Sequence, residues 1–215
     1  MKKIISGKVR EVFEVDESSL VIVTTDRISA FDVILNSEIP GKGTALNLLS
    51  NFWFSYTKDI IPNHIISTSI EDLPEEFKQN AAYYQDRTVL VKKLDMLPYE
   101  FIVRGYIFGN MWEAYRKGDE FCGQKISGDY QQAEALAAPI VTPSKKVNEG
   151  HDEYISLEQL SRELGDELAK KLCDLSLALY QRCYAYAKDR GIIIADTKFE
   201  FGFDRSGVLT LGDEI

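Results

Sequence analysis

The sequence lacks the features that mark a disulfide-stabilised or membrane-spanning protein. It has three cysteines, Cys122, Cys173 and Cys183, and no two of them form a CxxC pair. We therefore expect buried thiols in a reducing compartment rather than a disulfide framework or a zinc site. No window approaches the roughly 18 apolar residues of a membrane span, and no apolar segment follows the N-terminal lysines. These absences predict a soluble cytoplasmic protein.

The chain also lacks an excess of positive charge. Its 25 lysines and arginines are outnumbered by 34 aspartates and glutamates, which gives a net charge of −9. Such a chain gains little from counterion release and has no polybasic segment, so we expect neither a nucleic-acid nor a membrane partner. The motifs GxxxxGK[ST] and GxGxxG are missing too, which argues against a P-loop and a Rossmann turn.

The first third of the chain predicts strands followed by a helix. "KVREVFEV", residues 8–15, alternates, and "SLVIVTT", residues 19–25, is a dense β-branched run. Together they predict an antiparallel hairpin. After the loop "PGKG", residues 44–59 predict a helix with Thr44 as its N-cap. The expected apolar face of this helix consists of Leu46, Leu49, Trp53 and Tyr56.

A break in the middle of the chain predicts two lobes. Strand-like runs at residues 87–94 and 99–109 are separated by the connector "DMLP". We expect a hinge there, between an N-terminal lobe over residues 1–94 and a C-terminal lobe over residues 95–215. Clefts between lobes commonly bind small ligands. Residues 118–150 look irregular, and "APIVTPSKKVNEGHDE" predicts a long loop.

The last part of the chain predicts two helices and a closing hairpin. Ser156 and Gln159 have the spacing of a capping box, so a helix is expected to start there. A long helix should begin at a cap on Asp166 and end at Gly191. The segments "IIIADTKFEF" and "VLTLGDEI" then flank the turn "DRSG".

The closing hairpin carries charged side chains at alternate positions. A four-residue turn over residues 204–207 would pair Phe203 with Val208. Side chains two residues apart on a strand share a face. The side chains expected on one face are Asp196, Lys198, Glu200 and Asp213. Phe199 and Phe201 would point the other way, into a core.

This pairing makes Glu200 and Asp213 diagonal neighbours, within reach of a shared cation. Two carboxylates together with phosphate oxygens and water suit Mg²⁺. The alternative is a solvated strand face with an ordinary cross-strand pair between Lys198 and Asp213. Periodicity alone favours that alternative.

Two segments near the N-terminus offer further candidate residues. In "GKVR", Lys8 and Arg10 share a face beside a glycine, which suits a flap over phosphates or an exposed basic edge strand. "TTDRISAFD" places Asp26, Ser29 and Asp32 after a strand. These groups suit a small polar ligand, or they form a capped turn.

Two later segments also carry candidate residues. Arg104 lies inside the apolar run "IVRGYIFG", and a buried arginine needs either an ion-pair partner or an anionic ligand. "KKVNEGHDE" contains Lys146, His151 and Asp152, which suit metal or acid–base chemistry, although a lone histidine in a loop more often belongs to a polar surface.

Taken together, these segments resemble the phosphoribosylaminoimidazole-succinocarboxamide synthase (SAICAR synthetase) family of purine biosynthesis. The segments that carry the resemblance are "GKVREVFEV", "TTDRISAFDV", "VKKLDMLP", "IVRGYIFG", "TPSKKVNEGHDE", "ADTKFEFG" and "LGDE". They follow the order and approximate spacing of the family over essentially the whole chain. The chain is similar to the family members with a longer loop before "HDE".

The resemblance implies a two-lobed α+β fold, related to kinase-like nucleotide binders, with antiparallel sheets and ATP in the cleft. It implies an ATP-dependent ligase with ATP and Mg²⁺ as cofactors. The substrates would be L-aspartate and the carboxylate of 5-amino-1-(5-phosphoribosyl)imidazole-4-carboxylate, and the by-products ADP and phosphate. A local chemical reason agrees, since a carboxylate reacts with an amine only after activation, here by phosphoryl transfer.

The resemblance also implies roles for particular residues. The residues implied to bind ATP are Lys8, Arg10, Lys93, Leu94, Met96, Glu200 and Asp213, the last two through Mg²⁺. The residues implied to act at the reacting groups are Lys146, Asp196 and Lys198. The residues implied to contact the imidazole substrate or aspartate are Ser29, Asp32, Arg104 and Asn110.

The sequence departs from the family pattern at three places. Asn110 stands where a serine is usual, and Lys145 where a threonine is common. Family chains continue beyond "GDE" with a Ser-Arg pair for the ribonucleotide phosphate and a helical part, whereas this sequence ends at Ile215. We would expect impaired turnover from a polypeptide that is complete at that point.

Two other functions compete with the ligase. One is a truncated homologue that binds ATP and Mg²⁺ without turnover, and the other is a small-molecule kinase on the same fold. The sequence leaves open whether the chain forms a homo-oligomer.

Overall fold

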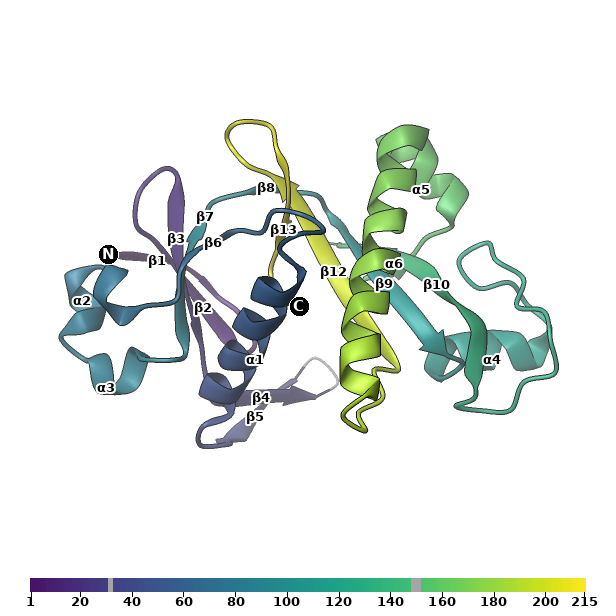
Figure 1. Ribbon diagram of the computed structural model, residues 1–215, viewed down its shortest axis with the longest axis horizontal. Coiled ribbons are helices and arrows are strands. Elements are labelled where there is room, and N and C mark those ends of the chain that lie inside the picture. The colour runs from purple at the N-terminus through teal and green to yellow at the C-terminus, as the bar shows by residue number, and fades with distance from the viewer. Residues whose placement is uncertain (31–32, 148–151) are drawn as a thin grey trace. The chain divides into compact units, whose positions relative to one another are not determined.

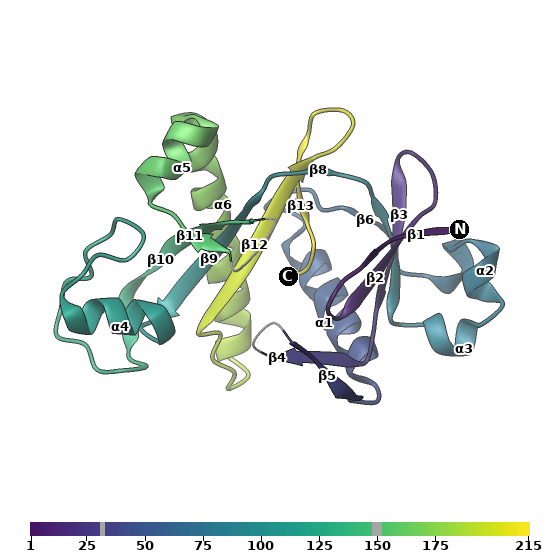
Figure 2. The same cartoon turned by 180° about the vertical axis from the view of Figure 1, so that it is seen from behind.

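The computed structural model describes residues 1–30, 33–147 and 152–215, and it confirms the expected α+β fold (Figures 1 and 2). The chain divides into two compact units. The first consists of Met1–Asp95 and Gly202–Thr210, and the second of Met96–Phe201 and Leu211–Ile215. The sequence-based division placed the hairpin tip, Gly202–Thr210, in the C-terminal lobe. None of the helices in the described residues has the length and apolar character that a membrane crossing requires.

The first unit is built on a five-stranded antiparallel sheet in the order β1-β2-β3-β7-β6. Its strands are β1 (Lys2–Ser6), β2 (Arg10–Glu14), β3 (Ser19–Thr24), β6 (Ile65–Ser67) and β7 (Thr88–Lys92). β2 and β3 pair with Arg10 opposite Thr24, which confirms the predicted hairpin. Val21 and Val23 point into the core and pack against Phe77 of α2 (Glu75–Lys78). The remaining short elements are β4 (Arg27–Ala30), β5 (Val33–Glu38), a 3-10 turn (Ile70–Asp72) and α3 (Ala81–Tyr84).

Helix α1 (Lys42–Thr57) begins two residues before the expected N-cap. The carboxylate of Asp26 accepts hydrogen bonds from the backbone N–H groups of Gly43, at 2.8 Å, and Gly41, at 3.2 Å. A residue from another part of the chain therefore caps the helix, and the prediction that Thr44 does so is wrong. Position 43 requires glycine, because a Cβ there would lie 2.4 Å from the carbonyl oxygen of Thr24.

The buried face of α1 also differs from the predicted face. The buried residues of the helix are Gly43, Asn47, Phe54 and Thr57. Leu46 and Leu49, expected to be buried, are 38% and 53% exposed. The helix turns Gly43 and Asn47 inward because its backbone approaches β3 at Gly43 and because Asn47 Nδ2 donates to the carbonyl of Asp86 at 2.9 Å.

The second unit contains most of a second sheet, whose strands lie in the order β11-β10-β9-β12-β13, with β8 also paired to β12. The strands are β8 (Asp95–Met96), β9 (Tyr99–Tyr106), β10 (Ala135–Lys145), β11 (Glu153–Tyr154), β12 (Asp196–Phe203) and β13 (Leu209–Gly212). The division between the units falls within β12 and β13. Strand β10 lies in the region predicted to be irregular. That prediction is wrong because Val141, Thr142 and Ser144 are buried beside β9, and two prolines obscure the strand pattern.

Helix α6 (Asp166–Lys188) covers one face of this sheet (Figures 1 and 2). Gly105 of β9 lies so close to Tyr180 of α6 that a Cβ would be 2.0 Å from the tyrosine oxygen. The neighbouring Phe101, Phe199 and Phe201 are fully buried. The predicted core position of the two phenylalanines of β12 is thus confirmed. By strand alternation, the even-numbered residues of β9 and β12 lie on the opposite face.

The remaining helices of the second unit are α4 (Gly109–Lys117) and α5 (Leu157–Leu164). Ser156 Oγ accepts a hydrogen bond from Gln159 N at 3.0 Å, so the predicted cap of α5 is confirmed. Helix α6 starts after Gly165, with Asp166 as its first residue rather than its cap. The helix ends at Lys188 with Asp189 as its C-cap, so the prediction that Gly191 forms the cap is wrong, although Gly191 does have a left-handed φ of 74° two residues later.

Candidate functional site

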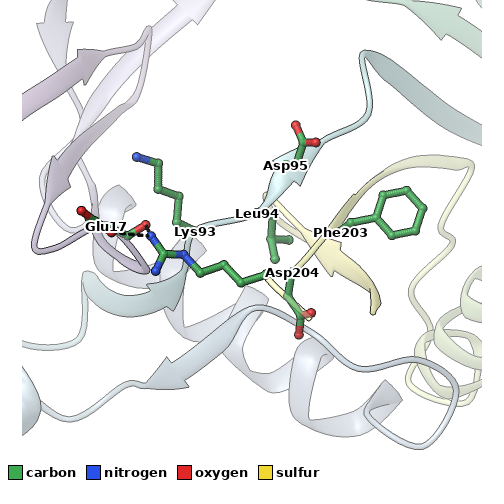
Figure 3. A pocket seen from close by; sticks show the side chains of 7 residues that line it. Glu17, Lys93, Leu94, Asp95, Phe203 and Asp204 are labelled. Atoms are coloured by element: carbon green, nitrogen blue, oxygen red, sulfur yellow. Dashed lines mark hydrogen bonds and ion pairs between the residues drawn. The ribbon is translucent and has the colours of Figure 1, made fainter. Parts of the chain in front are cut away.

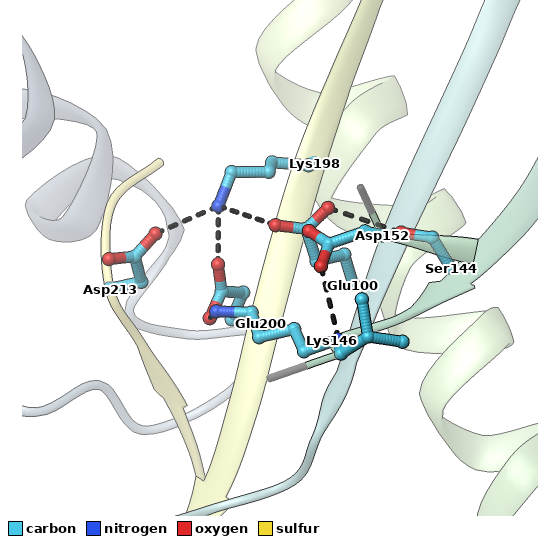
Figure 4. A network of polar contacts seen from close by, with 8 residues as sticks. Glu100, Ser144, Lys146, Asp152, Lys198, Glu200 and Asp213 are labelled. Carbon is cyan, nitrogen blue, oxygen red and sulfur yellow. Dashed lines mark hydrogen bonds and ion pairs between the residues drawn. The ribbon is translucent and has the colours of Figure 1, made fainter. Parts of the chain in front are cut away.

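The polar face of the second unit's sheet gathers most of the predicted site residues. In the pairing of β9 with β12, Asp196 lies opposite Arg104, and Lys198 lies opposite Ile102. In the pairing of β9 with β10, Ser144 lies opposite Glu100. All these side chains share the face that α6 does not cover. Figure 4 shows the charged group at one end of this face.

Lys198 is the centre of that group. Its Nζ contacts Glu200 Oε1, lies 3.0 Å from Asp213 Oδ2 and lies 3.3 Å from Glu100 Oε1 (Figure 4). Burial by itself would lower the pKa of Lys198, but Asp213, Glu200 and Glu100 together raise that pKa above its ordinary value. The ammonium group therefore stays charged at neutral pH.

Glu200 is the most deeply buried acid of the group, at 3% exposure. Its second oxygen, Oε2, accepts a hydrogen bond from Lys146 Nζ at 2.5 Å. Burial, followed by the nearby Asp213, raises the pKa of Glu200, because Lys146 and Lys198 offset only part of these effects. The group contains three carboxylates and two ammonium groups, so one negative charge is in excess when all are ionised.

The convergence of Glu200 and Asp213 was predicted, but the pairing behind the prediction is wrong. Asp204 N donates to Val208 O at 3.0 Å, so Asp204 and not Phe203 lies opposite Val208. Continued along the strands without interruption, this shift places a glycine, Gly212, opposite Glu200. Asp213 follows the end of β13 with φ of 58°, and this left-handed backbone returns its carboxylate to Lys198.

Glu200 and Asp213 fit a magnesium ion held partly by substrate. Their oxygens converge on one point, which is marked by the Lys198 ammonium. Within residues 1–30, 33–147 and 152–215, no cluster of three or more Asp, Glu, His or Cys side chains could hold a metal. Two carboxylates suffice for Mg²⁺ where phosphates and water complete the shell. His151 lies outside the described residues.

Arg104 forms a second group on the same face. It is 8% exposed, and it donates to Thr142 Oγ1 at 3.1 Å, to Asp196 Oδ2 at 3.4 Å and to the hydroxyl of Tyr154 at 3.1 Å. The ring of Phe121 lies 5.5 Å from its guanidinium carbon. Arg104 therefore does form an ion pair, with Asp196, which was one of its two expected roles. Its three hydrogen bonds still leave two of the five guanidinium N–H groups for an anionic ligand.

Asn110 lies in the first turn of α4, beyond the same strand, and is exposed. The N-cap residue, Phe108, offers no side-chain acceptor to the N–H groups of this turn. Helix N-termini of this kind favour anions. The amide of Asn110 can add a donor to such a site.

The first unit holds the predicted phosphate-binding residues. Lys8 lies in the turn between β1 and β2, which Gly7 N closes by donating to Arg10 O at 2.8 Å. Arg27 secures this turn, because its NH2 donates to Gly7 O at 3.1 Å. Asp26, which caps α1, and Arg27, which secures this turn, are thus two residues of "TTDRISAFD" with a structural function. Ser29 is half-buried in β4 and Asp32 lies outside the described residues.

The first unit also contains a pocket of 310 Å³ beside the expected hinge (Figure 3). It is lined by Glu17, Lys93, Leu94, Asp95, Phe203, Asp204 and Arg205. Lys93 Nζ pairs with Glu14 at 2.8 Å, and Arg205 pairs with Glu17. Lys93 and Leu94, which the resemblance implies to bind ATP, thus line this pocket, whereas Met96 does not.

Three residues of the polar face were missed from the sequence, namely Glu100, Ser144 and Tyr154. Glu100 and Arg104 lie four residues apart in a strand, and that spacing was the available signal for their shared face. Ser144 and Tyr154 gave no such signal, because β10 and β11 were expected to be loop.

Comparisons with known proteins agree with these observations. The family model described as SAICAR synthetase matches residues 3–215. A phosphoribosylaminoimidazole-succinocarboxamide synthase of Lachnospira eligens is 48% identical over 217 residues, covering 97% of this chain and 72% of the relative.

Two solved structures are similar as well. A SAICAR-synthase from Saccharomyces cerevisiae complexed with SAICAR superposes with a TM-score of 0.91 at 39% identity, covering 100% of this chain and 73% of that one. A SAICAR synthetase in complex with ADP has a TM-score of 0.78 at 26% identity, covering 98% and 79% of the two chains.

Proposed function

The chain belongs to the SAICAR synthetase family, and we propose on this basis that it is an ATP-dependent ligase. It joins the amine of L-aspartate to the carboxylate of 5-amino-1-(5-phosphoribosyl)imidazole-4-carboxylate, and releases ADP and phosphate. The observation that carries the proposal is the match over residues 3–215, which includes every site residue named above. The similar ADP complex supports the use of a nucleotide.

The reaction needs activation of a carboxylate. Transfer of the γ-phosphoryl group of ATP to the imidazole carboxylate would form a mixed anhydride, with ADP as the leaving group. The aspartate amine then attacks the carbonyl carbon, loses a proton and displaces phosphate. Such chemistry depends on positioning and charge neutralisation more than on a nucleophilic side chain.

The charged group around Lys198 suits this task. Glu200 and Asp213 would hold a magnesium ion, which would supply positive charge against the phosphate oxygens of the nucleotide. The ammonium group of Lys198 lies beside these two carboxylates and carries a positive charge, so its proposed role is to stabilise anionic oxygens rather than to accept a proton. Lys146, held against Glu200 at 2.5 Å, would supply a second positive charge to the same oxygens.

The other predicted residues take supporting roles in this proposal. The residues proposed to contact the phosphates are Lys8 and Arg10, and those proposed to contact adenine are Lys93, Leu94 and Met96. The residues proposed to contact the imidazole substrate or aspartate are Ser29, Asp32, Arg104, Asn110 and Asp196. The ion pair between Arg104 and Asp196 would hold the guanidinium plane for a carboxylate or phosphate.

The ligase proposal is tested by the substrate dependence of ADP release. ADP should form only when both aspartate and the imidazole carboxylate are present, and the phosphate should be released as the free ion. Equal ADP release without aspartate would contradict ligation. Phosphate found on a product hydroxyl would indicate a small-molecule kinase, and ATP binding without ADP release a non-catalytic module.

The metal proposal is tested by Glu200→Gln. This variant should weaken Mg²⁺-dependent ATP binding, measured by calorimetry, while the circular dichroism spectrum stays unchanged. Lys145→Met is a matched control, because Lys145 pairs with Glu163 at 2.5 Å and has no described contact with Glu200. Unchanged affinity in the glutamine variant would mean that the hairpin face is structural.

A further inference from the structure

The proposed function leaves one carboxylate of the charged group without a role. Glu100 Oε1 lies 3.3 Å from Lys198 Nζ, and the side chain of Glu100 is only 14% exposed. Its other oxygen, Oε2, accepts a hydrogen bond from Ser144 Oγ at 3.1 Å (Figure 4). Ser144 is itself 2% exposed and lies directly opposite on β10. One oxygen is thus fixed by the sheet, and the other faces the lysine.

Lys198 and a divalent cation would compete for the same acceptors. Magnesium binds carboxylate oxygens at about 2.0–2.1 Å. The Lys198 ammonium already contacts Glu200 Oε1 and lies 3.0 Å from Asp213 Oδ2. A cation bound between these two acids would repel the ammonium at such short range. Lys198 therefore needs another acceptor whenever the cation is bound.

Glu100 meets that need, and we propose that it is a positioning residue for Lys198. It retains the ammonium beside the cation site when Glu200 and Asp213 bind the metal. This inference rests on the proposed function, which supplies the metal and the reacting oxygens that Lys198 would then face. Ser144 assists by preventing rotation of the Glu100 carboxylate away from the lysine.

The structure explains why Glu100 rather than another acid has this role. The register that places Phe199 opposite Phe101 would place Glu200 opposite Glu100 one pair further along. Like charges in such a cross-strand pair are destabilising. The ammonium of Lys198 lies between them and can move from Glu200 towards Glu100 without leaving the face of the sheet. Asp213 lies beyond the end of β13, so it has no cross-strand partner position next to Glu200 from which it could take over the ammonium in this way.

A double-mutant cycle on Mn²⁺ binding tests the proposal without turnover. The four proteins are the native chain, Glu100→Gln, Lys198→Met and the double variant, each titrated with Mn²⁺ by electron paramagnetic resonance. Glu200→Gln measures binding at other sites. With Lys198 present, Glu100→Gln should weaken Mn²⁺ binding about tenfold, in the middle of the range of couplings between contacting charged groups. In the Lys198→Met background the same change should have less than about a twofold effect.

The cycle separates positioning from direct action on the metal. An equal loss of Mn²⁺ affinity in both backgrounds would mean that Glu100 attracts the cation through space, and this would overturn the proposal. The proposal would also be overturned if Glu100→Gln lowered the affinity in neither background. Ser144→Ala is a second variant with little risk to folding, and it should give a smaller loss that also requires Lys198. Because no nucleotide or substrate is used, the cycle can succeed even if the ligase assay fails.

Discussion

Asp26 should stabilise the first unit through its charge, and replacing it by alanine tests this. Its carboxylate accepts hydrogen bonds from Gly43 N and Gly41 N and forms an ion pair with Arg87 at 3.2 Å. Loss of a helix cap costs about 1 kcal/mol. Arg87 is 9% exposed, so the substitution would leave a largely buried guanidinium without its ion-pair partner. This loss adds about 2 kcal/mol, less than for a fully buried ion pair, because water still reaches the Asp26 side.

Asp26→Ala should therefore lower the free energy of unfolding by about 3 kcal/mol. With a urea m-value of about 1.5 kcal/mol/M for a unit of this size, the midpoint should fall by about 2 M. Trp53 of α1 reports this unit, so unfolding can be followed by its fluorescence in a Trp112→Phe background. Glu17→Ala is the matched control. Glu17 also pairs with an arginine, but its side chain is 92% exposed and the expected change is below about 1 kcal/mol.

The pH dependence gives a second, independent readout. The hydrogen bond from Gly43 lowers the pKa of Asp26 against the opposing effect of burial, and Gly41 and Arg87 lower it further. The folded pKa thus lies below the unfolded value of about 3.9. The stabilisation is present above pH 4 or so and disappears as the pH falls through the folded pKa, so the deficit of Asp26→Asn should shrink below about pH 4. A pH-independent deficit, or a midpoint shift of the alanine variant within about 0.3 M, would refute the charged cap.

Two further substitutions have clear expected outcomes. Gly105→Ala should destabilise the second unit by about 1–3 kcal/mol in urea unfolding, since its Cβ would overlap the Tyr180 hydroxyl. The cost should be smaller in a Tyr180→Phe background, and equal costs in both would contradict the proposed clash. Arg104→Lys should raise the KM for the imidazole substrate about tenfold or more, because one ammonium cannot reach both Asp196 and Tyr154. An unchanged KM would leave Arg104 with a structural role alone.

Strand alternation predicted the composition of the polar face well. Side chains alternate between the two faces of a strand, and no tertiary contact changes this alternation in β12. It places Lys198 and Glu200 on one face and buries Phe199 and Phe201 on the other. The position of Asp213 does not follow from it. The turn shifts the pairing by one residue, and a left-handed residue after the strand restores the contact. Side-chain periodicity gives no signal for either effect. The prediction therefore placed Glu200 and Asp213 close together correctly, but it assumed the wrong residue pairing in the hairpin.

Helix α1 shows a different limit. Its predicted apolar face consisted of large side chains, whereas the helix approaches β3 at Gly43 and bonds to the carbonyl of Asp86 through Asn47. A close backbone approach favours small residues, and hydrophobic periodicity cannot detect them. Its cap comes from Asp26, which is remote in sequence, so local capping rules cannot identify it either.

The adjacent residues Lys145 and Lys146 show why one departure from the family pattern is compatible with the proposed site. Successive side chains of a strand point to opposite faces. Lys146 contacts Glu200, whereas Lys145 pairs with Glu163 of α5 at 2.5 Å. The Lys145 hydrogen bond, followed by that of Tyr99, lowers the pKa of Glu163 to about 2, and burial with the Glu163 contact raises that of Tyr99 to about 12. The lysine found where threonine is common thus belongs to a separate polar group that joins β10 to α5. Its substitution should leave the charges around Lys198 unaltered.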